Sequence, residues 1–149
     1  MEKVRAETSP FSQIGQVGIV VNDIDQAINY LNSLGIETFE PKRIQITERW
    51  LRGKPANYKC ELKFARLGSV ELELIQPIEG ETIHKEFLES KGEGIHHLGF
   101  FVADLDKEVA KLTKLGVKVI QSGRRPGGGG FAYLDTYVGS GILLELIQR

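Results

Sequence analysis

Apolar and polar positions alternate in blocks that predict a strand, a helix and further strands in the first half of the chain. The apolar run over residues 14–21 predicts a strand. Apolar positions then recur every three or four residues up to Leu34, which predicts an amphipathic helix. Asp23 or Asp25 is the expected N-cap of this helix, and Gly35 is expected to end it. Further strands are expected near Thr38–Phe39 and over residues 59–67 and 69–76.

The same pattern returns in the second half. The run QVGIVVNDIDQAINYLNSLGIETFE from Gln16 reappears without a gap as HLGFFVADLDKEVAKLTKLGVKVIQ from His97. Both halves close on Leu-Glu-Leu-Ile-Gln. The repeat predicts a helix over residues 106–115 and strands over 95–102, 118–121, 131–136 and 142–148. Each half therefore reads as one βαβββ module.

These elements predict an α+β fold made of two tandem βαβββ modules around one cleft. We expect a leader over residues 1–13, a first module over 14–77, a linker with a short helix over 78–94, and a second module over 95–149. Each module is too small to bury a good core alone, so residues 14–149 should fold as one domain. The long polar stretch over residues 41–57 contains Trp50 and is expected to be a loop or short hairpin over the cleft mouth.

Composition excludes several classes of function. The formal net charge is −1, so no basic surface points to nucleic acid. No apolar run approaches the length of a membrane span, and the polar start of the chain does not suggest a secretory signal. Cys60 is the single cysteine, which fits a reducing compartment. We expect a cytoplasmic protein that acts on a small molecule.

Four polar residues occupy equivalent positions in the repeat. Strand alternation places apolar residues such as Ile19 and Phe100 under the helices, and places the four polar residues on the opposite, concave face. One imidazole, two carboxylates and one amide oxygen suit Co²⁺, Mn²⁺, Zn²⁺ or Ni²⁺. The candidate ligands are Gln16, Glu73, His97 and Glu145. The alternative is that these are polar strand residues, and that Gln16 only donates hydrogen bonds.

The motifs GEGIHHLGFFVADLD and GILLEL resemble the vicinal oxygen chelate (glyoxalase/bleomycin resistance/dioxygenase) superfamily, and within it most resemble the methylmalonyl-CoA epimerases. The resemblance implies a glyoxalase-like half-barrel with a curved, eight-stranded mixed sheet. Carried over by position, the family's metal ligands fall on the same four residues. Those epimerases usually have His where this chain has Gln16, whereas lactoylglutathione lyases can use a Gln, Glu, His, Glu set.

The resemblance also implies a reaction. A metal on a carbonyl oxygen makes the neighbouring α-proton easier to remove, so the expected activity is that of an isomerase acting through an enolate. Epimerisation needs bases on both faces of the α-carbon. The resemblance nominates Glu145 as one base, and strand alternation, which predicts that Glu61 and Lys63 face the same side, makes Glu61 the candidate for the other. The substrate is expected to be a small molecule such as an acyl-CoA thioester, and the protein is expected to be a homodimer.

Two other readings stay open. A lactoylglutathione lyase would use the same ligand types, and a bleomycin-resistance-like protein would bind a ligand without a metal. His96 is expected to be structural and His84 to lie on the surface. The stretch Gly127–Gly130 is expected to be a loop tip, with Arg124 and Arg125 either solvated or paired with phosphates.

Overall fold

The computed structural model describes residues 3–37, 39–41 and 45–149 of the 149-residue chain. The chain divides into two compact units. Unit 1 comprises Met1–Gly15, Ile44–Ala56 and His97–Arg149, and unit 2 comprises Gln16–Arg43 and Asn57–His96. Unit 1 thus combines most of the second module with the start of the chain and with a segment that lies inside the first half of the sequence.

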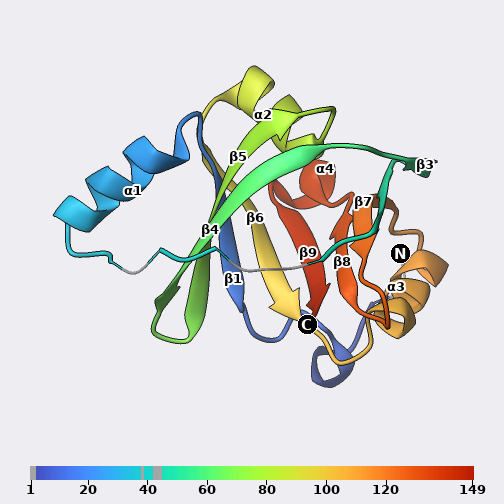
Figure 1. Ribbon diagram of the computed structural model, residues 1–149. Coiled ribbons are helices and arrows are strands. Elements are labelled where there is room, and N and C mark those ends of the chain that lie inside the picture. The colour runs from blue at the N-terminus through green and yellow to red at the C-terminus, as the bar shows by residue number, and fades with distance from the viewer. Residues whose placement is uncertain (1–2, 38, 42–44) are drawn as a thin grey trace. The chain divides into compact units, whose positions relative to one another are not determined.

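Unit 2 is built on three strands with one helix on a face of the sheet. Its strand order is β1-β5-β4, with β1 parallel to β5 and β4 antiparallel to it. Figure 1 shows α1 in blue beside these strands, and α2 follows β5. The elements are β1 (Gln16–Val20), α1 (Ile24–Ser33), β4 (Lys59–Leu67), β5 (Val70–Glu79) and α2 (Ile83–Lys91).

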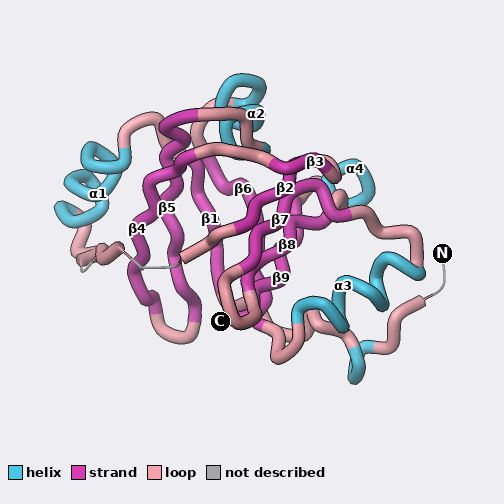
Figure 2. Tube along the Cα trace, turned by 45° about the vertical axis from the view of Figure 1, so that its right-hand side comes forward, coloured by secondary structure: helices cyan, strands magenta, loops and turns pink. Residues whose placement is uncertain are grey.

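Unit 1 repeats this scheme with more strands. Its strand order is β3-β2-β7-β8-β9-β6, and β6 and β9 pair in parallel as β1 and β5 do. Strand β6 begins in unit 2 and continues into unit 1. Figure 2 shows α3 and the short α4 in cyan. The elements are a 3₁₀ turn η1 (Ala6–Thr8), β2 (Glu48–Leu51), β3 (Lys54–Pro55), β6 (Gly94–Phe101), α3 (Leu105–Lys114), β7 (Val119–Arg124), β8 (Gly130–Leu134), α4 (Tyr137–Ser140) and β9 (Leu143–Gln148).

The predicted α+β class with mixed strand pairing is confirmed, but the described residues form nine strands rather than eight. The stretch over residues 41–57 contains the hairpin β2–β3, and β2 pairs antiparallel with β7. In the strand expected near Thr38–Phe39, Thr38 lies outside the described residues. Next to Phe39, Glu40 forms only an isolated bridge with Phe64.

The helix boundaries follow the predicted signals. Asp23 caps α1 by accepting a hydrogen bond from the backbone N–H of Gln26 at 3.1 Å, which satisfies one free amide of the first turn. Asp104 caps α3 in the same way. Gly35 follows α1 with φ of +92°, a left-handed conformation that favours glycine. The linker helix is confirmed as α2, with Thr82 as its N-cap.

Each unit has its own apolar core under its helix. In unit 2, Leu74 packs with Ile19 and with the apolar face of α1, as the alternation predicted. In unit 1, Phe100 and Leu146 pack under α3. The segment predicted as a leader contributes Phe11, whose ring meets Phe100 edge-on at a centroid distance of 5.1 Å. Across the described ranges, no helix is long and apolar enough to cross a membrane.

Candidate functional site

Unit 1 brings two of the four predicted ligands into contact. His97 lies on β6 and Glu145 on the neighbouring β9, where Glu145 is the register partner of Gly99. His97 Nε2 lies 2.9 Å from Glu145 Oε2, and the side chains are 0% and 6% exposed. Because the alternate residues of both strands pack under α3, this pair lies on the opposite face of the sheet, as predicted.

The separation of these two atoms fits binding of one metal ion. Nitrogen and oxygen ligands lie about 2.0–2.2 Å from a divalent transition metal such as zinc, so two ligands of one ion are about 3 Å apart in octahedral and about 3.4 Å apart in tetrahedral geometry. The 2.9 Å between His97 Nε2 and Glu145 Oε2 is close to the octahedral value, and these are the donor types that borderline divalent metals take. The pair therefore suits a divalent transition metal.

Two further buried residues on this face were missed by the sequence analysis. Tyr133 on β8 is the register partner of both Glu145 and Gln121, and its ring meets that of His97 edge-on at 5.0 Å. Tyr133 is 4% exposed and Gln121 only 1%. Partners across an antiparallel ladder share a face, so counting from Glu145 through the predicted strands would have pointed to Tyr133.

Unit 2 carries the other two predicted ligands on one face of its sheet. Gln16 on β1 is the register partner of Glu71 on β5, and Gly18 is the partner of Glu73. All three polar residues are buried, with at most 7% of any of them exposed. Gln16 Nε2 donates a hydrogen bond to Glu71 Oε1 at 2.9 Å. Glu71 was not singled out as a site residue by the sequence analysis.

The predicted direction of Glu61 is wrong. In the ladder between β4 and β5, Glu61 is the partner of Gln76 and Lys63 is the partner of Leu74, which packs under α1. Phe64 is the partner of Glu73 instead. Glu61 and Lys63 therefore lie on the α1 face of the unit 2 sheet, opposite to Glu73. This direction removes the reason for assigning Glu61 as a base.

Two histidines form a buried cluster in unit 2. His84 on α2 is 5% exposed, so its expected surface position is wrong, and His96 is 2% exposed. The two rings lie 4.6 Å apart between centroids, and Phe87 meets His96 edge-on. His96 thus packs against α2, which fits the structural role expected for it.

The arginines beside the glycine-rich stretch contact the protein itself. Arg124 Nη2 lies 2.9 Å from Asp106 Oδ1, and Arg125 Nη2 donates to the backbone oxygen of Gln148 at 3.1 Å. The glycines form the turn between β7 and β8, where Gly128 N donates to Arg125 O. These contacts hold the β7–β8 hairpin against α3 and β9.

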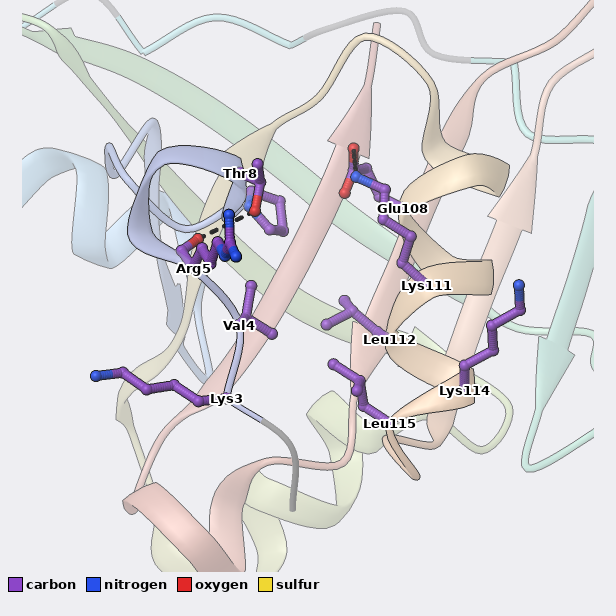
Figure 3. Close-up of a pocket in the computed structure, with 10 residues that line it drawn as sticks. Lys3, Val4, Arg5, Thr8, Glu108, Lys111, Leu112, Lys114 and Leu115 are labelled. Carbon is purple, nitrogen blue, oxygen red and sulfur yellow. Dashed lines mark hydrogen bonds and ion pairs between the residues drawn. The ribbon is translucent and has the colours of Figure 1, made fainter.

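Unit 1 also has a hollow of about 400 Å³ between the start of the chain and α3. Figure 3 shows Val4, Leu112 and Leu115 facing one another there, while Lys3 and Lys114 point outward. The hollow lies on the α3 side of the sheet. His97 and Glu145 lie on the other side, so the hollow is separate from the candidate site.

Comparisons with known proteins agree with the resemblance drawn from the sequence motifs. A profile of the Glyoxalase/Bleomycin resistance protein/Dioxygenase superfamily matches residues 15–134. The uncharacterized protein YqjC of Bacillus subtilis (strain 168) is 29% identical over 140 residues, which cover 92% of this chain and 92% of that protein.

Solved structures of two epimerases are similar over nearly the whole chain. The methylmalonyl-CoA epimerase from Mycobacterium tuberculosis is 21% identical with a TM-score of 0.69, covering 95% of this chain and 91% of its own. The methylmalonyl-CoA epimerase of Streptomyces coelicolor, in complex with 2-nitronate-propionyl-CoA, is 23% identical with a TM-score of 0.72, covering 92% of this chain and 96% of its own. These similarities establish a common fold.

Proposed function

Because the chain belongs to the Glyoxalase/Bleomycin resistance protein/Dioxygenase superfamily, we propose that it is a metal-dependent isomerase that removes a proton next to a carbonyl group. The observation that carries this proposal is the buried contact of 2.9 Å between His97 Nε2 and Glu145 Oε2. The ligands that the resemblance assigns are Gln16, Glu73, His97 and Glu145. A bound divalent metal would supply a Lewis acid for the substrate's carbonyl oxygen.

In this proposal Glu145 also acts as the base. Its carboxylate is 6% exposed, so little water competes with it for the α-proton of a bound substrate. His97 and Tyr133 pack beside it and limit the positions that its side chain can adopt. Glu145 would hold the abstracted proton and deliver it to a neighbouring carbon in an isomerisation. Inversion of the α-carbon needs in addition a proton donor on its opposite face.

The proposed substrate is an acyl-CoA thioester, and the proposed reaction is an epimerisation of the methylmalonyl-CoA type. The support is the shared fold with two methylmalonyl-CoA epimerases, one of them in complex with a CoA derivative. The protein is further proposed to be a homodimer, which light scattering after gel filtration would test.

A lactoylglutathione lyase is the second candidate function. Two observations favour it: Gln16 stands where the epimerases usually have His, and Glu61 faces α1 rather than the side of Glu73. Isomerisation of a hemithioacetal can use one base for both proton transfers, so Glu145 would suffice.

The test begins with the metal content of protein purified without chelator, measured by mass spectrometry. We expect about one divalent transition metal per chain in the wild type and loss of that metal in Glu145→Ala. The next assay follows exchange of the α-proton of methylmalonyl-CoA in deuterium oxide, beside isomerisation of a glutathione hemithioacetal. Activity on one substrate identifies the reaction. Absence of metal even after addition of Co²⁺, Mn²⁺ or Zn²⁺ would leave a bleomycin-resistance-like binding protein as the better reading.

A further inference from the structure

Glu71 is a buried carboxylate that the proposed reaction does not use. It lies on β5 two residues before Glu73, on the same face of the unit 2 sheet, and is 4% exposed. Its Oε1 accepts a hydrogen bond of 2.9 Å from Nε2 of Gln16, which is also 4% exposed. Because both residues are buried, water competes little with this hydrogen bond.

This hydrogen bond fixes which way the Gln16 amide faces. The side-chain amide of a glutamine has one oxygen, which accepts hydrogen bonds, and one nitrogen, which donates them. Its last torsion angle has no sharply preferred value, so the torsion alone does not decide which atom faces a given neighbour. Only the oxygen can bind a metal. Glu71 Oε1 accepts from the nitrogen of Gln16, so the nitrogen and not the oxygen of the amide faces Glu71. The Gln16 oxygen is thereby turned away from Glu71.

The repeat shows that this carboxylate belongs to one module only. The pairing of Gln16 with Glu71 in unit 2 corresponds to the pairing of His97 with Leu143 in unit 1. The module whose first strand offers an imidazole has an apolar residue at this position. The module whose first strand offers an amide has an acid there, which can orient the amide.

We propose that Glu71 is a positioning residue that makes Gln16 a metal ligand, an inference that rests on the proposed metal site. It has two effects on the amide. It holds the oxygen in the ligating orientation, and through the hydrogen bond it draws electron density toward that oxygen. Partners of this kind orient metal ligands and raise their basicity in other metal sites. Glu71 compensates in this way for the weakness of a neutral amide as a ligand.

The test is titration of Co²⁺ into metal-free full-length protein by calorimetry, together with the visible absorption spectrum of the Co²⁺ complex. Glu71→Leu copies the residue of the other module, and we expect it to weaken Co²⁺ binding by roughly 10–100-fold. Glu71→Gln can still accept the hydrogen bond through its own amide oxygen, so we expect it to lose less affinity and to keep the wild-type spectrum. Urea unfolding of each variant verifies that it is folded.

A double-mutant cycle separates positioning from a general structural role. In a Gln16→Ala background there is no amide to orient, so Glu71→Leu should cause no further loss of affinity. An equal loss in both backgrounds would overturn the inference, as would Glu71→Leu binding Co²⁺ as tightly as the wild type. If the wild type itself binds no metal, the proposed function fails and this inference fails with it, an outcome distinct from the other two.

Discussion

The side-chain oxygen of Gln148 accepts a hydrogen bond of 2.9 Å from the backbone N–H of Leu105, the first residue of α3. Gln76 accepts the same bond from Ile24, the first residue of α1, also at 2.9 Å. The last letter of the repeated Leu-Glu-Leu-Ile-Gln thus ties the last strand of each module to the start of its helix. The first backbone amides of a helix have no partner within the helix. Each glutamine accepts from one of these amides, so the two modules are stabilised in the same way.

Gln148→Leu should destabilise the protein by about 1–3 kcal/mol, because the Leu105 amide next to the core loses its acceptor. The measurement is the free energy of unfolding from urea titration. Gln148→Glu is the matched control, since a carboxylate still accepts and is favourable at a helix N-terminus. Equal stability of the Leu and Glu variants would show that the hydrogen bond contributes little.

Glu73→Ala and Glu61→Ala make a matched pair on opposite faces of the unit 2 sheet. In the proposed site Glu73 is a ligand, so removal of its carboxylate should weaken Co²⁺ binding by more than the roughly 10–100-fold that outer partners of metal sites contribute. Glu61→Ala should bind Co²⁺ as the wild type does, because Glu61 lies on the α1 face. Calorimetric titration of both variants checks this, and a large loss in Glu61→Ala would contradict the assignment of faces.

Metal affinity should fall as the pH is lowered from 7.5 to 5.5. A ligating imidazole must be neutral, so binding competes with protonation of His97, and protons are released when the metal binds. Calorimetry in buffers of different ionisation enthalpy would count the released protons. His97→Gln, which copies the residue of the first module, should bind more weakly and lose most of this dependence on pH. A pH-independent affinity in the wild type would argue against His97 as a ligand.

Gly130→Ala should destabilise the protein more than Gly128→Ala. Both glycines have left-handed φ values, +143° and +112°, so alanine is strained at either position, at a cost of about 1–3 kcal/mol. A Cβ on Gly130 would in addition collide with the backbone oxygen of Gly123, whereas one on Gly128 meets open space. Urea unfolding of the two variants would measure the difference, and similar values would mean that the β7–β8 hairpin can shift to make room.

The gap-free internal repeat made most of the helices, caps and core faces predictable. Asp23, Gly35 and their equivalents in the second module are local signals, because a cap depends on the residues within one turn of it. The inward face of the closing strands was also predictable, since Leu74 and Leu146 recur in the same register. That His97 and Glu145 lie on one face of the sheet followed from the same alternation.

The direction of Glu61 was predicted wrongly because Cys60, Leu62 and Phe64 were taken as the apolar face of this strand. Phe64 and Ala65 are adjacent and both buried, so β4 has apolar residues on both faces and its composition cannot decide the direction. The register can: Leu67 and Val70 pair across the two-residue turn Gly68–Ser69, and counting back from them places Phe64 opposite Glu73. Glu71 was missed because its role depends on a partner 55 residues away, at Gln16.

The hairpin formed by β2 and β3 has a consequence for synthesis of the protein. Residues 44–56 belong to unit 1, yet β7, the strand with which β2 pairs, comes about 70 residues later in the chain. On the ribosome, the hairpin emerges long before its partner and must wait with an unpaired edge while unit 2 is completed. The first half of the polypeptide therefore cannot reach its final structure as an isolated fragment, because the partner strand of this hairpin is not yet part of it.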